Sequence, residues 1–197
     1  IAQTKFSIGL TINELERLCH ELYPNTQHEF LFELIRHARA CAYEKKYALR
    51  SESDDERYLN INNWKLEFEK LIDNINITNL SQCNIIDVGI GNGLEAKTLF
   101  NELNNVTGID ISKEALIYAK QRCNKLNCVV NDAENLIDIK NNSQDIYISL
   151  RTYQSTLFDI NASLNEAYRV LRPGGAIIIS VPYAYYDSST KSLVKGI

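Results

Sequence analysis

The stretch IIDVGIGNGLEAKTL, residues 85–99, places three glycines at alternate positions between an apolar run and a segment with helical spacing. Glycine adopts left-handed backbone conformations that other residues avoid, and it leaves no side chain between the backbone and a bound molecule. In open α/β sheets, ligands bind beyond the carboxyl ends of the strands, often at a glycine-rich turn after the first strand. This stretch therefore predicts a strand, a ligand-binding turn and a helix in succession.

Short apolar runs alternate with amphipathic segments from residue 83 onward. We predict five strands, at 84–88, 106–109, 128–130, 146–150 and 176–181, and three helices, at about 93–103, 113–125 and 161–170, with Ser112 as the N-cap of the second. Alternating strands and helices with nearly continuous apolar strands predict a parallel sheet covered on both faces. The expected fold class is α/β, a Rossmann-like, doubly wound and mostly parallel sheet.

Residues 1–80 have a different, helical pattern. Two [ST]-x-x-E capping boxes, at 11–14 and 26–29, predict helices over about 12–22 and 27–47, and a third is predicted over about 63–74. The second helix carries apolar residues at spacings of three and four, which predict a buried stripe: Phe30, Leu34, Ala38 and Cys41. The polar residues 50–62 are predicted to form a linker.

Composition restricts the class of protein. The 197 residues have a net charge of −4, which disfavours a protein whose main task is to hold nucleic acid. Five cysteines without a CxxC pair predict free thiols in a reducing, cytoplasmic compartment, and neither a disulfide framework nor a metal site. No apolar run is long enough for a membrane span. Because the chain contains no methionine, we expect a piece of a longer protein.

Three carboxylates follow successive predicted strands. Asp87 ends the first, Asp110 ends the second and Asp132 follows the third. Asp87 beside the glycine turn would repel a pyrophosphate but suits an ammonium group, while the free amides of a helix beginning near Gly93 suit a carboxylate. Asp110 is placed to accept bonds from ribose hydroxyls, and Asp132 to meet an adenine edge. The set predicts a site for an adenosine-linked amino acid. A dinucleotide is disfavoured because Leu94 stands where G-x-G-x-x-G requires glycine.

These motifs together resemble the class I S-adenosylmethionine-dependent methyltransferases over about residues 83–181. DVGIGNG resembles the family's first motif, Asp110 its acidic second motif and DAEN its third, while EAYRVLRPGGAIIIS resembles the helix, turn and fifth strand of the small-molecule type. The resemblance implies S-adenosylmethionine as cofactor and S-adenosylhomocysteine as product. The implied cofactor contacts are Asp87, Gly89, Gly91, Gly93, Asp110, Ile111, Asp132, Ala133 and Leu150.

The resemblance also implies an organisation into two parts. Residues 1–80 would form a helical lid over residues 81–197, the cofactor-binding core. The family's sheet ends with a sixth and a seventh strand, and only 16 residues follow Val181, so we expect these strands to be absent and the core to be truncated. A truncated core could lack activity by itself.

The acceptor is expected to contact the loop after the fourth strand, residues 149–159. Arg151 could bind a carboxylate or phosphate of the acceptor, and Tyr153 could orient or deprotonate it, with Gln154 beside them. The alternative is that these polar residues only cap the following helix. Further candidates for the cleft wall are Tyr183, Tyr185 and Tyr186, and candidates for the lid are Arg57, Tyr58 and Trp64.

The leading function is methyl transfer to a small molecule; a nucleic-acid partner is possible but not favoured, and no membrane partner is expected. Two alternatives stay open: an RNA-modifying methyltransferase, and a non-catalytic subunit that binds S-adenosylmethionine. An amino methyltransferase acting on DNA bases or protein glutamine is disfavoured, since the chain lacks an N-P-P-Y signature.

Overall fold

The computed structural model describes residues 28–49, 61–75, 77, 79–153, 159–181, 184–187 and 192–195. The helix predicted over 12–22 and most of the linker lie outside these residues, as do Arg57, Tyr58, Gln154 and Tyr183. For Trp64, Tyr185 and Tyr186 only the backbone is described.

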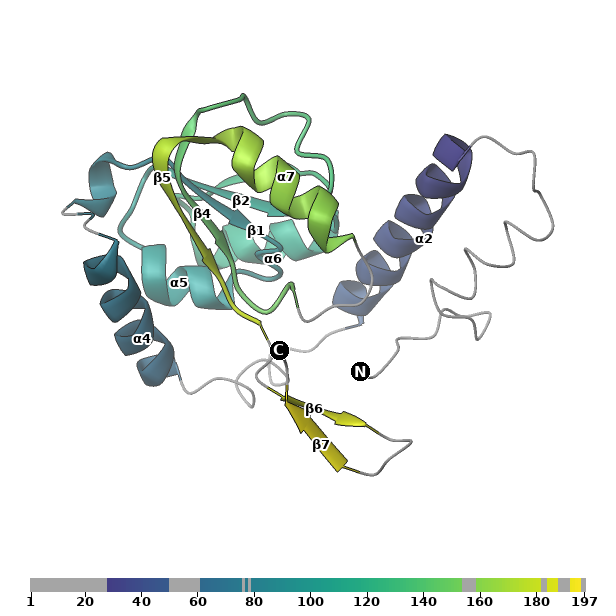
Figure 1. The fold of residues 1–197 in the computed structure, drawn as a ribbon, viewed down its shortest axis with the longest axis horizontal. Helices are drawn as coiled ribbons and strands as arrows, with labels where there is room; N and C mark the ends of the chain where they lie inside the picture. Colours follow the sequence, from purple (N-terminus) through teal and green to yellow (C-terminus); the bar gives the residue numbers. More distant parts are fainter. Residues whose placement is uncertain are drawn as a thin grey trace.

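Five parallel strands form the central sheet (Figure 1): β1(Ile85–Val88), β2(Val106–Asp110), β3(Asn127–Val130), β4(Gln144–Ser149) and β5(Leu171–Ile179). Their order is β3-β2-β1-β4-β5, and every neighbouring pair is parallel. The predicted α/β fold class is confirmed. Because the chain moves outward from β1 in one direction and returns to place β4 on its other side, the switch in strand order lies between β1 and β4, where ligands of such sheets bind.

The fifth strand begins earlier than predicted. β5 starts at Leu171 instead of residue 176, and its pairing with β4 shifts register between Gln144 and Ile146. A Cβ at Gly175 would lie 2.9 Å from the carbonyl oxygen of Arg172 and 3.0 Å from that of Asp145. Gly174 and Gly175 therefore lie at an irregularity within β5, and do not form a turn that precedes the strand.

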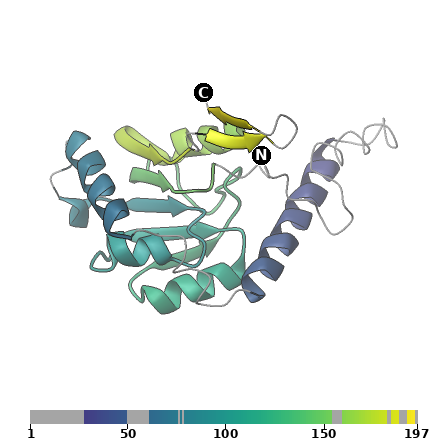
Figure 2. The same ribbon diagram turned by 90° about the horizontal axis from the view of Figure 1, so that it is seen from below.

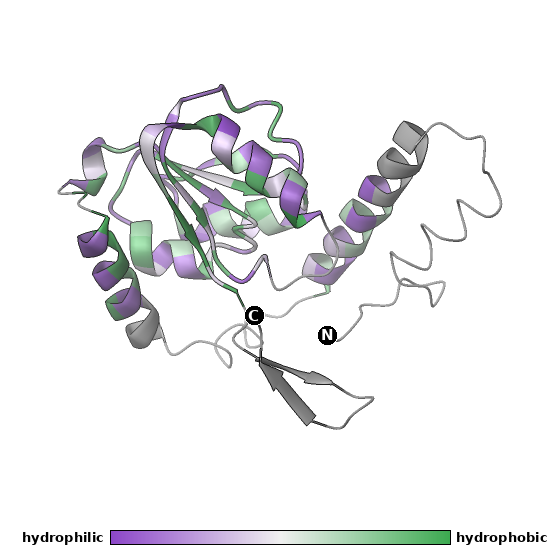
Figure 3. Cartoon of the chain, in the orientation of Figure 1, coloured by the Kyte–Doolittle hydropathy of each residue, from purple (hydrophilic) through white to green (hydrophobic). Residues whose placement is uncertain are grey.

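Helices cover both faces of the sheet, whose strands are largely hydrophobic (Figure 3). Two clusters of buried apolar side chains form the core. One face packs against α4(Ile61–Asn74), α5(Leu94–Phe100) and α6(Lys113–Arg122), where the rings of Phe68 and Phe100 meet edge to face at 5.3 Å. The other face packs against α7(Ile160–Val170), through Tyr147, Ala167 and Val170. The short helix η1(Leu80–Gln82) precedes β1.

The helix α2(His28–Ala48) lies at the carboxyl ends of the strands, to one side of the sheet (Figure 2). The predicted apolar stripe is wrong in its described part, because Cys41 is exposed and Ala38 only half-buried. The buried side chains of α2 are instead Arg39 and Tyr47, at 4% and 8% exposure. The helix packs on the polar rim of the sheet and not on its apolar core, so a charged and an aromatic side chain are buried.

The C-terminal strands β6(Ala184–Asp187) and β7(Ser192–Lys195) pair with each other in antiparallel fashion. They form a separate two-stranded sheet and do not extend the five-stranded one. In the part of the chain that the structure describes, β5 is therefore an edge of the main sheet, and the strands β6 and β7 were not predicted from the sequence.

Candidate functional site

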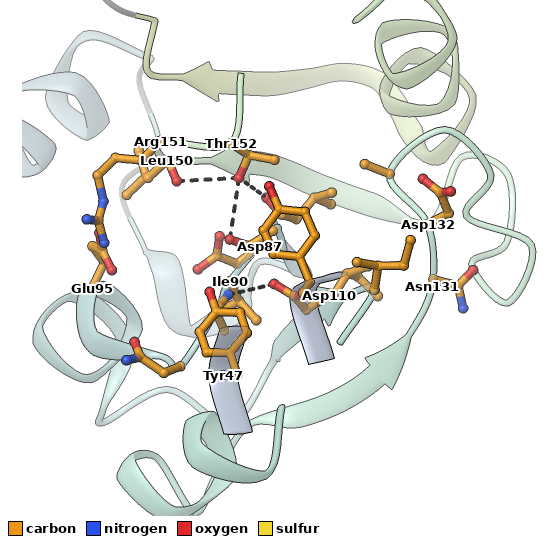
Figure 4. Close-up of a pocket in the computed structure, with 18 of the residues that line it drawn as sticks. Tyr47, Asp87, Ile90, Glu95, Asp110, Asn131, Asp132, Leu150, Arg151 and Thr152 are labelled. Carbon is orange, nitrogen blue, oxygen red and sulfur yellow. Dashed lines mark hydrogen bonds and ion pairs between the residues drawn. The ribbon is translucent and has the colours of Figure 1, made fainter. Parts of the chain in front are cut away.

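A cavity of about 220 Å³ opens at the carboxyl ends of β1, β2 and β4 (Figure 4). Its walls come from the glycine turn, the loops after β2, β3 and β4, and one side of α2. Of the residues predicted to contact a ligand, the cavity brings together Asp87, Gly89, Gly91, Asp110, Ile111, Asp132, Ala133, Leu150 and Arg151. Gly93 and Tyr153 do not line it.

The glycine turn has the left-handed backbone that the sequence predicts. Gly89 has a φ of 76° and Gly91 a φ of 58°. A Cβ at Gly91 would lie 2.6 Å from the hydroxyl of Tyr47, and one at Gly89 would collide with the side chain of Thr152. Both the conformation and the lack of space require glycine at these two positions.

Gly93 has a different role from the other two glycines. It is the N-cap of α5 with a φ of 74°, and a Cβ there would lie 2.7 Å from the Cα of Ala119 in α6. Its absent side chain permits close packing of the turn against α6. Its place in the structure is therefore one of packing, away from the cavity.

Asp87 lies at the floor of the cavity, and its residue is 3% exposed. Burial, together with the negative charges of Glu95 and Asp110, raises the pKa of its carboxyl group to about 8. Deprotonation leaves a charge in a low-dielectric site beside two other acids, which is unfavourable without a nearby cation. The site therefore favours a ligand that brings a positive charge to Asp87.

Asp110, at the end of β2, forms a hydrogen bond with the glycine turn. Its Oδ2 accepts a hydrogen bond from the amide of Gly91 at 2.8 Å, and its Oδ1 accepts one from the amide of Ser112 at 2.9 Å. Burial raises the pKa of Asp110 overall, although these hydrogen bonds act in the opposite direction. Each carboxylate oxygen has a second lone pair, so the group can still accept bonds from a ligand.

Asp132 is held from both sides in the loop after β3. Its Oδ1 accepts the amide of Glu134 at 3.0 Å, and its Oδ2 accepts a charge-assisted bond from Arg39 of α2 at 2.6 Å. Burial raises the pKa of Asp132, and Arg39 partly opposes that effect. An adenine at this position would share the carboxylate with Arg39.

Arg151 follows β4 and forms an ion pair with Glu95 of α5 at the cavity wall (Figure 4). Its backbone has a φ of 61°, which is unfavourable for a residue with a side chain, and its amide donates to the hydroxyl of Ser180 at 2.6 Å. Strained backbone that its surroundings hold in place is found preferentially at functional sites.

Tyr153 points into the interior, away from the cavity. Its hydroxyl lies 2.8 Å from that of Ser163 in α7 and 3.4 Å from that of Tyr147 in β4. The residue is 6% exposed. The predicted contact of Tyr153 with an acceptor is not supported by this geometry, because the hydroxyl hydrogen-bonds within the core.

Several cavity residues were not found from the sequence. They are Arg39, Tyr43, Lys46 and Tyr47 of α2, together with Asn92, Glu95 and Thr152. A pattern in the sequence of α2 could have indicated these residues. Arg39, Tyr43 and Tyr47 recur every four residues, so they share one face of the helix, next to the face of the predicted apolar stripe. This face carries the polar and aromatic groups that lie against the strand ends.

Within the described ranges, no group of three or more His, Cys, Asp or Glu side chains is placed to hold a metal ion. Over the same residues, no helix combines the length and the apolar character that a membrane crossing requires.

A comparison with protein families identifies the domain that contains this site. The sequence profile of the family described as a methyltransferase domain matches residues 86–179, from β1 to the end of β5. Residues 86–179 therefore form a methyltransferase domain of the class I, S-adenosylmethionine-dependent type that the motifs resemble. The predicted family is confirmed, and the matched residues include the glycine turn and the three strand-end acids.

Relatives with assigned names are methyltransferases. A ubiquinone/menaquinone biosynthesis C-methyltransferase of Rickettsia typhi is 37% identical over 127 residues, which cover 58% of this chain and 48% of that protein. A demethylmenaquinone methyltransferase of Tropheryma whipplei is 30% identical over 96 residues, covering 48% of this chain and 40% of its own length. The chain thus spans about half the length of the curated relatives it matches.

Solved structures show the same fold. A structure from Methanococcus maripaludis superposes with a TM-score of 0.52 at 23% identity, covering 60% of this chain and 55% of that one. Phosphoethanolamine N-methyltransferase 2 of Haemonchus contortus, in complex with phosphomonomethylethanolamine and S-adenosylhomocysteine, has a TM-score of 0.52 at 25% identity. That alignment covers 64% of this chain and 30% of the nematode protein.

Proposed function

We propose that this chain binds S-adenosylmethionine in the cavity at the strand ends and transfers its methyl group to a small-molecule acceptor. The observation that carries the proposal is the buried carboxyl of Asp87 beside a turn in which Gly89 and Gly91 line the cavity without a side chain. A ligand with a cationic amino group satisfies Asp87, and the open turn admits its aliphatic part. The acids Asp110 and Asp132 at the next two strand ends can then accept bonds from ribose hydroxyls and adenine.

The residues that would hold the cofactor are those predicted from the sequence, apart from Gly93, which packs against α6. When bound, S-adenosylmethionine supplies a methyl group on a sulfonium, which is already activated for displacement. The protein's part is to align the acceptor with that methyl and to exclude water. Leu150 and Ile111, which line the cavity, provide apolar surface for this purpose.

The segment 1–80 is expected to form a lid over the core, residues 81–197; we propose that α2 has this role within it, because α4 packs on a face of the sheet. Helix α2 contributes Arg39, Tyr43, Lys46 and Tyr47 to the cavity wall. A wall from a separate helix allows the cavity to open for exchange and to close for reaction.

A small-molecule acceptor is favoured by the names of the relatives, which include enzymes of quinone biosynthesis and one acting on phosphoethanolamine. Of the cations that line the cavity, Arg151 belongs to the loop 149–159, where the acceptor is expected. Its pairing with Glu95 fixes the guanidinium at that wall, where it can contact an anionic or polar group of the acceptor.

Isothermal titration calorimetry of the chain with S-adenosylhomocysteine tests the proposal, with NAD titrated in parallel. We expect one site for S-adenosylhomocysteine and no heat from NAD. Binding of NAD, or the lack of binding by S-adenosylhomocysteine, would refute the proposed cofactor.

A further inference from the structure

Helix α2 is attached to the sheet rim by two separate polar anchors. The first is Arg39, which is 4% exposed and donates to Asp132 at 2.6 Å and to Glu134 at 2.5 Å. Arg36, one turn earlier, lies 3.7 Å from the carboxylate of Asp132 and 3.9 Å from that of Glu134. This anchor joins α2 to the loop after β3.

The second anchor is Glu44, which binds the N-terminus of α6. Its carboxylate accepts bonds from the Ser112 hydroxyl at 3.0 Å, the Lys113 amide at 2.7 Å and the Glu114 amide at 3.0 Å. Burial raises the pKa of Glu44, but the bonds from the Glu114 and Lys113 amides outweigh it, and the net shift is downward. Amides at a helix N-terminus have no partner within the helix, so a carboxylate from another helix satisfies them well.

The cavity lies beneath the part of α2 that runs between and just beyond these anchors. Tyr43, Lys46 and Tyr47 line the cavity, with Tyr47 labelled in Figure 4. The Tyr47 hydroxyl lies 2.6 Å from the position that a Cβ of Gly91 would take. A ligand on the glycine turn must pass this hydroxyl or contact it. When both anchors are made, α2 therefore covers the site.

The attachment is polar in character, which suits reversible release. Each anchor joins a charged side chain to polar partners that water can solvate when the helix moves away, so release exposes no large apolar surface at either point. The first anchor also engages Asp132, the acid proposed to meet the adenine. Attachment of α2 and occupation of the adenine site therefore involve the same carboxylate.

We propose that Arg39 and Glu44 form a two-point latch that holds α2 over the adenosyl site and sets the rate at which the cofactor is exchanged. This inference rests on the proposed function, since it takes an adenosyl ligand to be the molecule that enters. Neither residue touches the reacting atoms, so both act as positioning residues.

The test compares Arg39→Ala and Glu44→Gln with Lys45→Ala, using the full chain. Lys45 is exposed in the same helix, and its replacement removes one positive charge, as Arg39→Ala does. Hydrogen exchange of the ligand-free proteins measures the attachment of α2, and surface plasmon resonance measures the dissociation rate constant of S-adenosylhomocysteine. Exchange in β1 and β4 serves as the internal check that the core is intact.

Both latch variants should exchange the amides of residues 36–48 faster than the wild type and should release S-adenosylhomocysteine about tenfold faster or more, as the loss of a charge-assisted bond predicts. Lys45→Ala should match the wild type in both measurements. If wild type binds S-adenosylhomocysteine and both latch variants release it at the wild-type rate, the latch is refuted while the proposed function stands. If wild type binds no S-adenosylhomocysteine, the proposed function fails, and the latch on cofactor exchange fails with it.

Discussion

The carboxylate of Asp110 accepts a hydrogen bond from the amide of Gly91 at 2.8 Å, and this bond ties the end of β2 to the glycine turn after β1. The second oxygen of the same group accepts the amide of Ser112, at the start of α6. One side chain thus fixes two backbone segments that border the cavity. Its role in shaping the turn adds to the contact with ribose that the sequence predicts.

Asp110→Asn is expected to weaken S-adenosylhomocysteine binding at least about tenfold, because an amide group would set an N–H against one of the two backbone donors. The midpoint of thermal unfolding should fall as well. Calorimetry and thermal melts measure the two effects. Asp159→Asn, which removes an exposed carboxylate that accepts the amides of Asn161 and Ala162 outside the cavity, is the control and should change binding less than about twofold. Equal affinity of Asp110→Asn and wild type would remove Asp110 from the site.

Gly91→Ala should abolish binding, and Gly174→Ala is its matched control. Both glycines have a positive φ, of 58° and 81°, so each substitution carries a similar backbone strain of about 1 kcal/mol. A Cβ at Gly174 has nothing within 4 Å, whereas one at Gly91 meets the hydroxyl of Tyr47 at 2.6 Å in the cavity. Both variants should unfold at a lower temperature than the wild type. If Gly174→Ala lost affinity for S-adenosylhomocysteine as Gly91→Ala does, strain alone would account for the loss.

From the raised pKa of Asp87 we expect opposite effects of pH on the stability of the protein and on its affinity for S-adenosylhomocysteine. Its pKa rises from 3.8 to about 8 on folding because burial and the charges of Glu95 and Asp110 oppose ionisation. Its contribution to stability is therefore complete below the unfolded pKa and is lost as pH rises through about 8. Asp87→Asn stays neutral, so its unfolding temperature should exceed that of the wild type increasingly as pH is raised.

Binding of a cationic amino group favours the ionised form of Asp87, so the wild type should release a proton on binding S-adenosylhomocysteine. Its affinity should increase from about pH 6 to about pH 7.5, below the range in which the ligand's own amino group deprotonates. Asp87→Asn should bind weakly and show no such dependence. Calorimetry in buffers of different ionisation enthalpy measures the proton release, and the absence of any release would contradict this account of Asp87.

Arg151→Ala should separate cofactor binding from methyl transfer. Without the guanidinium, the negative charge of Glu95 still lies near the site proposed for the ligand's amino group and attracts it. The affinity for S-adenosylhomocysteine should therefore stay within about threefold of wild type. Turnover with a small-molecule acceptor found by screening should fall about tenfold or more. Arg172→Ala, which breaks another arginine–carboxylate pair, with Asp145 and away from the cavity, is the control. Unchanged turnover by Arg151→Ala would show that Arg151 does not contact the acceptor.

Tyr153→Phe should lower stability by about 1 kcal/mol, since it removes a buried hydrogen bond with Ser163 at 2.8 Å. Denaturant unfolding measures this change. Affinity for S-adenosylhomocysteine should not change, because the side chain lies in the core and outside the cavity. A variant with full stability and impaired methyl transfer to an acceptor would favour the contact with the acceptor that the sequence suggests.

The sheet was predictable because its strands are apolar and are separated by helices with clear starts. Ser112, predicted as an N-cap, does accept a bond from the Ala115 amide. The acids at the strand ends were predictable for the same reason, since parallel strands bring their carboxyl ends to one rim. Tyr153 was placed wrongly because the direction of a side chain after a strand depends on the neighbouring helix, here α7 with Ser163.

Helix α2 shows why the rest of the site could not be predicted. Apolar periodicity identifies the face of a helix that packs on an apolar surface, but α2 packs on a rim of carboxylates and free amides. Its anchoring residues, Arg39 and Glu44, have partners about 70 to 95 positions away in the sequence. No local pattern indicates such pairs.

A crystal structure of the chain with S-adenosylhomocysteine tests the central claim most directly. We expect the amino group beside Asp87, the homocysteine chain along Gly89 and Gly91, and the adenosine between Asp110 and Asp132. An adenosyl ligand bound elsewhere on the molecule, or a cavity that stays empty at saturating ligand, would contradict the account.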